Sequence, residues 1–593
     1  MALINQSKMM GVVGYTQLYP EIAMPPIEQL LSGIPRIWAI RLVSNIQNKL
    51  VGKPFFNPHF TDEKTSQIDV PRFFLGPDNY YFTLDVVRRY RHYIAKEEAM
   101  QMQPMECAAA SETPLLLLKH IMAAPEYDTK VSMPSLERNL FTAFLVANQT
   151  TMNRDQGVIP YGQEDIELYV ASLLLSRFAY NDFTNNETEL IELVRNQSSR
   201  TICFFDFICN NSLTKDLYND FLKEYEISSW HDYIRTYWAI ITFVQNKTGV
   251  LDFKRLRVED GLLSERIVDK DSIDIHEPIP LEKNVDYTTF RERPFIKIAP
   301  HEYVVIDISF LISRMYDGLY FIFNELWTRK HPDDKKRFNQ IYTTELSEEN
   351  ILTTCLKEVA KVNDWFSLSD KECKSIIRED KLSSPPDFYI RAGKDVYLFE
   401  CKDIKIQKEI KANGTIQQLL MEINKNLVGH LDKKGKRKKK GVGQLVRNAK
   451  RIQENLFAWD KVVDNNSRIF LVLVLADSKQ VAAGWKNYLN RKMQEECARQ
   501  KVNCKNVMPL ILMDLGTLIL YKYNFMENGF LNYFLKYCQE TEFDTRKIAS
   551  GDRITAIVNQ TLSFSGYMSN EKIVGGDVLW QDIKRILQIK RSS

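Results

Sequence analysis

Apolar residues recur every three or four positions through most of the first half of the chain, and this spacing is typical of amphipathic helices. The polar positions between them fall on the opposite helical face, as expected for helices that pack around a common core. The pattern predicts helices over 27–50, 83–99, 115–122, 136–148, 165–179, 187–196, 213–225 and 230–244. We therefore expect residues 1–299 to form a large, mainly α-helical region, with some strand between 250 and 299.

The second half of the chain mixes two periods. Apolar and polar residues alternate over 387–391 and 396–402, while 468–476 is continuously apolar, as in a central strand covered on both faces. Further strands are expected over 373–380 and 507–513, and helices over 306–328, 347–362, 410–431, 442–459, 482–500, 521–537 and 578–589. This order predicts an α+β protein, with a connecting helix at 300–334, an α/β domain with a mixed central sheet at 335–545, and a C-terminal tail with a helix at 546–593.

One predicted hairpin carries the clearest chemistry. Residues 392–395 separate its two alternating runs, and Gly393-Lys394 can form a two-residue turn, because glycine suits the positive φ of such a turn. With that turn, Asp387 faces Glu400 across the two strands, and Lys402 projects from the same face two residues later. Two opposed carboxylates repel each other, so a shared proton or a bound cation should offset the cost. Carboxylate oxygens are hard ligands that suit Mg²⁺ or Mn²⁺.

These residues resemble the motif of the PD-(D/E)XK nuclease superfamily. The resemblance rests on Pro386-Asp387, a gap of twelve residues, and Glu400-Cys401-Lys402 at the end of an apolar strand. It implies a restriction-endonuclease-like domain that hydrolyses phosphodiesters with a metal ion. Asp387, Glu400 and the backbone carbonyl of Cys401 would bind the metal, and Lys402 would orient the attacking water or stabilise charge.

The resembled family often takes a further carboxylate from the helix before the first strand. The sequence does not choose among the four candidates, which are Glu345, Glu348, Glu349 and Glu358. Part of the family also places a glutamine of the helix after the catalytic strands near the active site, often followed four residues later by tyrosine. Here Gln444 is followed by Asn448, and periodicity places both on the outer side of the predicted helix, so a solvated glutamine remains the alternative.

Positive charge is concentrated beside the motif. The chain has a net charge of only +3, but residues 401–451 carry fifteen Lys and Arg against four Asp and Glu. A basic run and the outer side of the next helix are therefore candidates for sequence-independent contacts with nucleic-acid phosphates. The candidates are Lys433, Lys434, Lys436, Arg437, Lys438, Lys439, Lys440, Gln444, Arg447 and Arg451. A solvated loop or a targeting signal remains the alternative for the run.

Composition limits the class of protein. The 593 residues suffice for several domains, and contents of 44% hydrophobic and 11% aromatic residues indicate a folded chain. Nine scattered cysteines form no CxxC pair, which favours a reducing compartment and argues against a zinc module. No signal-peptide pattern is visible, and the apolar runs are far shorter than the roughly 18–20 residues of a membrane span. We expect a soluble, cytoplasmic protein without membrane contact.

The motif and the charge distribution together predict a Mg²⁺- or Mn²⁺-dependent nuclease with Asp387, Glu400 and Lys402 as catalytic residues. DNA is favoured over RNA only because the resembled superfamily mostly cuts DNA. A helical region fused to such a nuclease resembles effectors of prokaryotic restriction and anti-phage systems, so we expect residues 1–299 to bind a protein partner or to oligomerise. The alternatives are a catalytically inactive nucleic-acid-binding or scaffold protein on the same fold, and an ordinary exposed hairpin with a Glu/Lys pair.

Overall fold

The chain divides into two compact units, each assembled from segments that are not contiguous in sequence. Unit 1 comprises residues 1–158, 182–186 and 225–314, and unit 2 comprises residues 159–181, 187–224 and 315–593. The computed structural model describes residues 13–50, 70–99, 112–125, 131–155, 166–176, 190–246, 249–260, 263–376, 384–481, 483–546, 553–570, 581, 583 and 585. The sequence-based division at 299/300, 334/335 and 545/546 differs from these units, in which helices from the first half of the chain join the second.

Unit 1 is mainly helical and contains one small sheet. Its strands lie in the order β1-β4-β3-β2, with β2 and β3 parallel and the other pairs antiparallel. The helices are α1 (Tyr15–Leu18), α2 (Ile27–Leu31), α3 (Arg36–Leu50), α4 (Val70–Phe74), α5 (Tyr80–Ala99), α6 (Thr113–Ala123), α7 (Met133–Asp155), α12 (Trp230–Asn246), α13 (Phe253–Asp260), α14 (Glu265–Lys270), α15 (Thr288–Glu292) and α16 (Ile308–Arg314), with short 3₁₀ segments at Pro77–Asn79 and Leu281–Tyr287. The strands are β1 (Leu251–Asp252), β2 (Ser272–Asp274), β3 (Phe295–Ala299) and β4 (Glu302–Val305).

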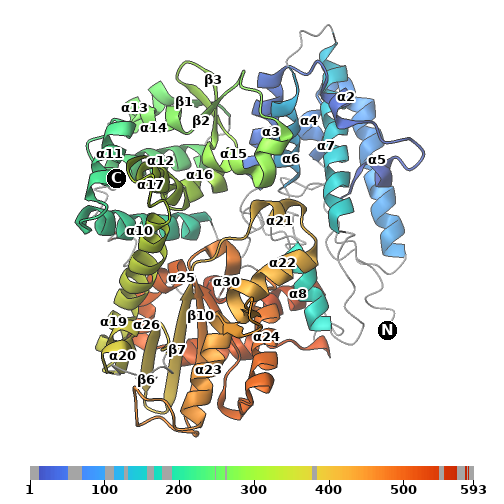
Figure 1. The fold of residues 1–593 in the computed structure, drawn as a ribbon. Coiled ribbons are helices and arrows are strands. Elements are labelled where there is room, and N and C mark those ends of the chain that lie inside the picture. The colour runs from blue at the N-terminus through green and yellow to red at the C-terminus, as the bar shows by residue number, and fades with distance from the viewer. Residues whose placement is uncertain are drawn as a thin grey trace. The chain divides into compact units, whose positions relative to one another are not determined.

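Unit 2 is built around a five-stranded mixed sheet in the order β11-β10-β7-β6-β5 (Figure 1). Strands β11, β10 and β7 run parallel, whereas β6 and β5 are antiparallel to their neighbours. The strands are β5 (Phe366–Ser369), β6 (Phe388–Ala392), β7 (Asp395–Lys402), β10 (Arg468–Leu475) and β11 (Ile511–Asp514). The predicted α+β fold, with a mixed central sheet in the C-terminal half, is confirmed.

Helices cover both faces of this sheet because both sets of alternating side chains are apolar. On one face, Val396 and Leu398 of β7 join a core that includes Val446 of α23 (Gly441–Gln453) and Leu489 of α24 (Trp485–Gln500). On the other face, Tyr397 stacks on Phe470 of β10 and contacts Phe530 and Phe534, at the start of α27 (Leu531–Glu540). Strand β7 is consequently buried along almost its whole length.

The remaining elements of unit 2 surround the sheet. They are α8 (Ile166–Ser176), α10 (Leu190–Asn210), α11 (Lys215–Tyr225), α17 (Asp317–Lys330), α18 (Arg337–Gln340), η5 (Ile341–Leu352), α19 (Thr353–Val362), α20 (Asp370–Ile376), α21 (Lys408–Asn413), α22 (Ile416–Ile423), η6 (Asn424–Val428), β8 (Gly429–Leu431), β9 (Arg437–Lys439), η7 (Ser478–Val481), η8 (Cys504–Asn506), α25 (Leu515–Leu520), α26 (Lys522–Asn528), α29 (Arg553–Thr561) and α30 (Phe564–Asn570). No helix in the described part of the chain is long and apolar enough to span a membrane.

Several local predictions are wrong, each for an identifiable reason. The first strand of the sheet is β5 rather than 373–380, because α20 (Asp370–Ile376) already occupies the start of that range. The amide and hydroxyl of Ser369 donate to the Glu372 carboxylate and so stabilise the first turn of this helix. Ser347 is not an N-cap, because α18, η5 and α19 follow one another without a break and its hydroxyl donates back to the Tyr342 carbonyl. Within the basic run, Arg437–Lys439 form strand β9, which pairs with β8, whereas residues 433–436 lie in the turn between the two strands. The predicted helix at 578–589 falls almost entirely outside the described residues.

Candidate functional site

The hairpin of β6 and β7 has the register that its sequence predicts. Tyr389 pairs with Leu398 and Arg391 pairs with Val396, while Gly393 in the turn has a φ of +62°. Glycine has no Cβ and therefore adopts positive φ with less strain than any other residue. Gly393 thus determines the position at which the two strands reverse. The register then determines which residues meet at the open end of the hairpin.

At that end, one ammonium group touches three oxygen atoms. The Nζ of Lys402 lies 2.7 Å from Oε1 of Glu400 and 3.5 Å from Oδ2 of Asp387. It also donates a 2.7 Å hydrogen bond to the backbone carbonyl of Cys401, whose own amide donates a 2.7 Å bond to Oδ2 of Asp387. The structure therefore brings together all four residues that the sequence proposes for the catalytic and metal sites.

A further carboxylate, on η5, interacts electrostatically with this group, and this interaction distinguishes it from its neighbours. Glu348 interacts electrostatically with Asp387 and Lys402, whereas the other three candidates form ion pairs elsewhere. These pairs are Glu345 with Arg337, Glu349 with Lys371, and Glu358 with Lys522. Glu348 lies in a stretch of π-helix, and such widened turns often occur at functional sites because they re-aim side chains.

Burial makes the charges of this site costly. Glu400 is fully buried, and its Oε2 has no hydrogen-bond partner among the described residues. Burial and then repulsion by Asp387 raise the pKa of Glu400 to about 8, and the same two causes raise the pKa of Glu348 to about 8. Burial opposes the charge on Lys402, but the surrounding carboxylates outweigh it and raise its pKa. Three acidic groups thus share one ammonium, which leaves room for a proton or a further cation.

The donors at this site suit a hard divalent cation. The described residues form no cluster of three or more His, Cys, Asp or Glu side chains placed to hold a metal. Mg²⁺, however, is commonly held by only one or two carboxylates, with water completing its coordination. The carboxylates of Asp387 and Glu400 and the carbonyl of Cys401 already converge on one cation, the Lys402 ammonium, and Oε2 of Glu400 remains available. The residues therefore fit the metal that the resemblance implies.

The candidates for nucleic-acid contact fall into two groups. Five lysines of the β8–β9 hairpin have exposed side chains, whereas Arg437 and Lys439 are partly buried and engaged by α24. The exposed residues are Lys433, Lys434, Lys436, Lys438 and Lys440. Sequence alone could not separate the two groups, because their partners Glu496 and Gln500 lie far along the chain.

The candidates on α23 lie closer to the carboxylates. Arg447 and Arg451 both donate to the carbonyl of Ser384, in the segment that leads into Asp387. Burial lowers the pKa of Arg447, while the charge of Glu400 opposes that shift. Gln444 is half-buried on the first turn of α23. Asn448, which sequence periodicity places on the outer side of this helix, is instead fully buried.

No model of a known protein family matches the chain, and no significantly similar curated protein or solved structure was found. The functional argument therefore depends on the geometry of the site.

Proposed function

We propose that this protein is a metal-dependent nuclease that hydrolyses phosphodiester bonds of nucleic acid. One observation carries the proposal, namely that Asp387, Glu400 and the Cys401 carbonyl converge on a single positive charge at a buried strand end. An ordinary exposed hairpin with a Glu/Lys pair would have no reason to bury Glu400 completely and to set Glu348 against the same group. Buried carboxylates with raised pKa values are typical of catalytic sites rather than of surface ion pairs.

Asp387, Glu400 and the carbonyl of Cys401 would hold Mg²⁺ or Mn²⁺, which when bound lowers the pKa of a coordinated water and neutralises charge on the phosphate. Lys402 would orient the attacking water or stabilise charge on a phosphate oxygen. The carboxylate of Glu348, with a pKa near 8, is suited to accept a proton near neutral pH. Arg447 and Arg451 position Asp387 by holding the Ser384 carbonyl.

DNA is the favoured substrate by resemblance alone, since no described side chain points to readout of a 2′-hydroxyl. A role as a cytoplasmic effector of a prokaryotic restriction or anti-phage system, with residues 1–299 binding a partner or oligomerising, rests on the same analogy. The free thiols among the described cysteines suit a reducing compartment.

The test is cleavage of DNA and RNA by the full chain with Mg²⁺ or Mn²⁺. We expect Asp387→Asn, Lys402→Met and Glu348→Gln each to lower the rate at least about a hundredfold, because each removes a group from the reacting centre. Glu349→Gln is the matched control, since its residue lies next to Glu348 but pairs with Lys371. If the wild type binds nucleic acid but cuts none under any of these conditions, the alternative of an inactive binding protein replaces the proposal.

A further inference from the structure

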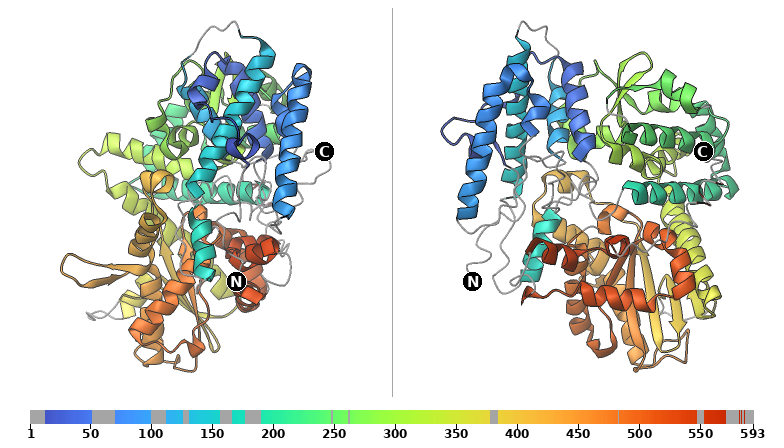
Figure 2. Two further views of the ribbon diagram at one scale, coloured as in Figure 1. Left: turned by 90° about the vertical axis from the view of Figure 1, so that its right-hand side faces the viewer. Right: turned by 180° about the vertical axis from the view of Figure 1, so that it is seen from behind.

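The β8–β9 hairpin, residues 429–440, forms a short projecting arm whose turn is held by hydrogen bonds within the hairpin. Leu431 pairs with Arg437, and Oδ1 of Asp432 accepts hydrogen bonds of 2.9 Å from the amides of Lys434 and Lys436. The arm extends away from the body of unit 2 in the left view of Figure 2. Because the turn is held by its own backbone and Asp432, the tip lysines are free to face outward, and the side chains of Lys434 and Lys436 are exposed.

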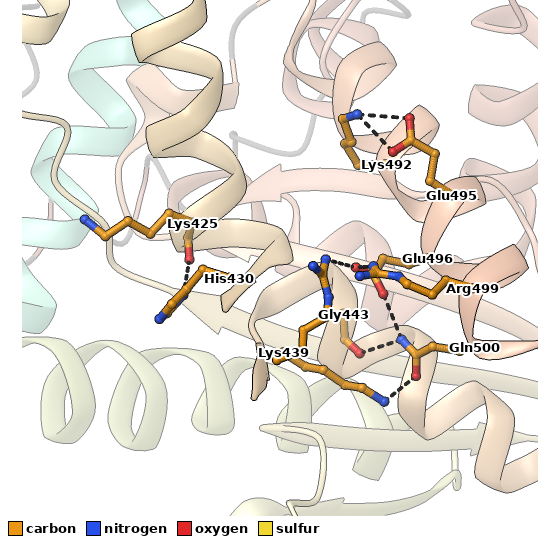
Figure 3. A network of polar contacts seen from close by, with 10 residues as sticks. Lys425, His430, Lys439, Gly443, Lys492, Glu495, Glu496, Arg499 and Gln500 are labelled. Atoms are coloured by element: carbon orange, nitrogen blue, oxygen red, sulfur yellow. Dashed lines mark hydrogen bonds and ion pairs between the residues drawn. The ribbon is translucent and has the colours of Figure 1, made fainter. Parts of the chain in front are cut away.

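The inward side of the arm is fastened to α24. Arg437 forms an ion pair of 2.5 Å with the buried carboxylate of Glu496, and Lys439 donates a 2.6 Å hydrogen bond to Gln500. Gln500 in turn donates to Glu496 and to the carbonyl of Gly443, the network shown in Figure 3. Because side chains alternate along β9, Arg437 and Lys439 point toward α24 and contact it, whereas Lys438 and the flanking lysines are exposed.

Positive charge continues from the base of the arm along α23. Burial, followed by repulsion from Arg447, Lys450, Arg451 and Arg499, lowers the pKa of Lys439 to about 8. These cations are thus close enough to repel one another. At the other end of this series, Arg447 and Arg451 donate to the carbonyl of Ser384, three residues before Asp387, so the basic groups lead from the arm to the carboxylates.

We propose that the exposed lysines of the arm and the basic residues of α23 form one track that binds the sugar-phosphate backbone of a nucleic acid and leads it to Glu400. The inference rests on the proposed function, because it takes Glu400 to be part of the catalytic site. It adds how a long substrate is held. A polyanion would relieve the repulsion among the clustered cations and release counterions. Flexible lysine side chains act as point charges, so the track would not read sequence.

The test measures binding of a labelled DNA duplex in EDTA over a range of salt concentrations, so that neither metal nor cleavage is involved. In the triple variant Lys434→Gln, Lys436→Gln, Lys438→Gln, we expect affinity to fall about 10- to 100-fold. The slope of log affinity against log salt should become shallower by about 2 to 3, since each lost phosphate contact removes roughly 0.9. Thermal unfolding should match the wild type, because the three side chains are exposed.

The matched control is Lys335→Gln, Lys336→Gln, Lys461→Gln, which removes the same charge from exposed lysines outside the arm. Equal losses in the two variants, no binding by the wild type, or equal competition by poly-glutamate would each overturn the proposed track. The two proposals fail separately. If the wild type binds DNA through the arm but never cleaves it with metal, the nuclease proposal is wrong. If the wild type cleaves DNA while the arm and control variants bind it equally well, the proposed track is wrong.

Discussion

Two buried carboxylates in this molecule, Asp271 and Glu400, are each paired with a cation but differ in how many of their oxygens accept hydrogen bonds. In unit 1, Asp271 receives hydrogen bonds of 2.9 and 2.8 Å from Nε and Nη2 of Arg314, and the hydroxyl of Tyr237 also donates to it. In unit 2, Glu400 has the Lys402 ammonium on one oxygen and no hydrogen-bond partner on the other among the described residues. Burial alone therefore does not distinguish a structural pair from a candidate active site.

The distinguishing feature is whether the charges are balanced and their oxygens occupied. Arg314 presents a planar fork to a single carboxylate, a bidentate geometry that fills both oxygens. Lys402 is one point charge shared among Asp387, Glu400 and Glu348. The first arrangement is complete without a ligand, whereas the second is suited to admit a proton or a metal.

The largest effect should come from breaking the complete pair. Arg314→Met leaves Asp271 buried without a counter-charge, and we expect the free energy of unfolding to fall by about 3–5 kcal/mol. Urea denaturation followed by circular dichroism measures this loss, and added Mn²⁺ should not reverse it. Arg293→Met is the control, since its partner Glu277 is partly exposed and the loss should stay within about 1 kcal/mol. Equal losses in the two variants would remove the contrast.

The corresponding change at the candidate site should cost less. In Lys402→Met we expect a loss of about 1–3 kcal/mol in EDTA, because Glu400 and Glu348 can take up protons instead of remaining charged. Mn²⁺ should then raise the unfolding temperature of this variant more than that of the wild type, since the metal would replace the missing ammonium. Thermal unfolding in EDTA and in Mn²⁺ gives both values. A smaller metal-induced shift in the variant would show that Lys402 does not stand in the position of the cation.

Metal affinity should depend on pH in the direction that the raised pKa values dictate. Below pH 8, the assigned ligand Glu400 tends to be protonated, so a bound metal must displace its proton, and the charge of the metal also favours loss of the proton on the neighbouring Glu348. We expect Mn²⁺ affinity to rise by up to about tenfold per pH unit for each proton released, and to level off above about pH 8. Calorimetric titrations in buffers of different ionisation enthalpy count the released protons. A flat profile between about pH 6 and 8 would contradict the assigned protonation.

The sequence specifies the hairpin because its information is local. Alternation and Gly393 set the register, and the register places Asp387, Glu400 and Lys402 together. Glu348 could not be chosen from sequence, since the four candidate glutamates differ only in which cation each one meets once the chain has folded. The basic run presents the same difficulty, because its sequence does not show that Arg437 pairs with Glu496, which lies 59 residues later.

The division of the chain depended on equally distant contacts. Arg200, on α10, donates to the carbonyl of Ala476 at the end of β10, and Asn196 of the same helix contacts Asp514 of β11. Helical periodicity predicts such a helix but not the sheet against which it packs. The mixed sheet itself was predictable, because the continuous apolar run at 468–476 is typical of a strand covered on both faces.

Near pH 5, the smallest change in stability should follow from Glu400→Gln, which keeps the shape of the side chain and resembles its protonated form. The pKa of Glu400 is raised from 4.5 to about 8, so the native state holds an extra proton between these values and loses stability as pH rises through that window. The variant lacks this dependence. We expect it to lie within about 1 kcal/mol of the wild type near pH 5 and to be the more stable protein above pH 8, while losing Mn²⁺ binding. Asp271→Asn should be destabilising at both pH values, because it weakens a pair whose charges are balanced. Urea titrations of both variants between about pH 5 and pH 9 measure the difference. If the Glu400→Gln protein were less stable than the wild type above pH 8, the buried carboxylate would be a structural partner of Lys402, as Asp271 is of Arg314.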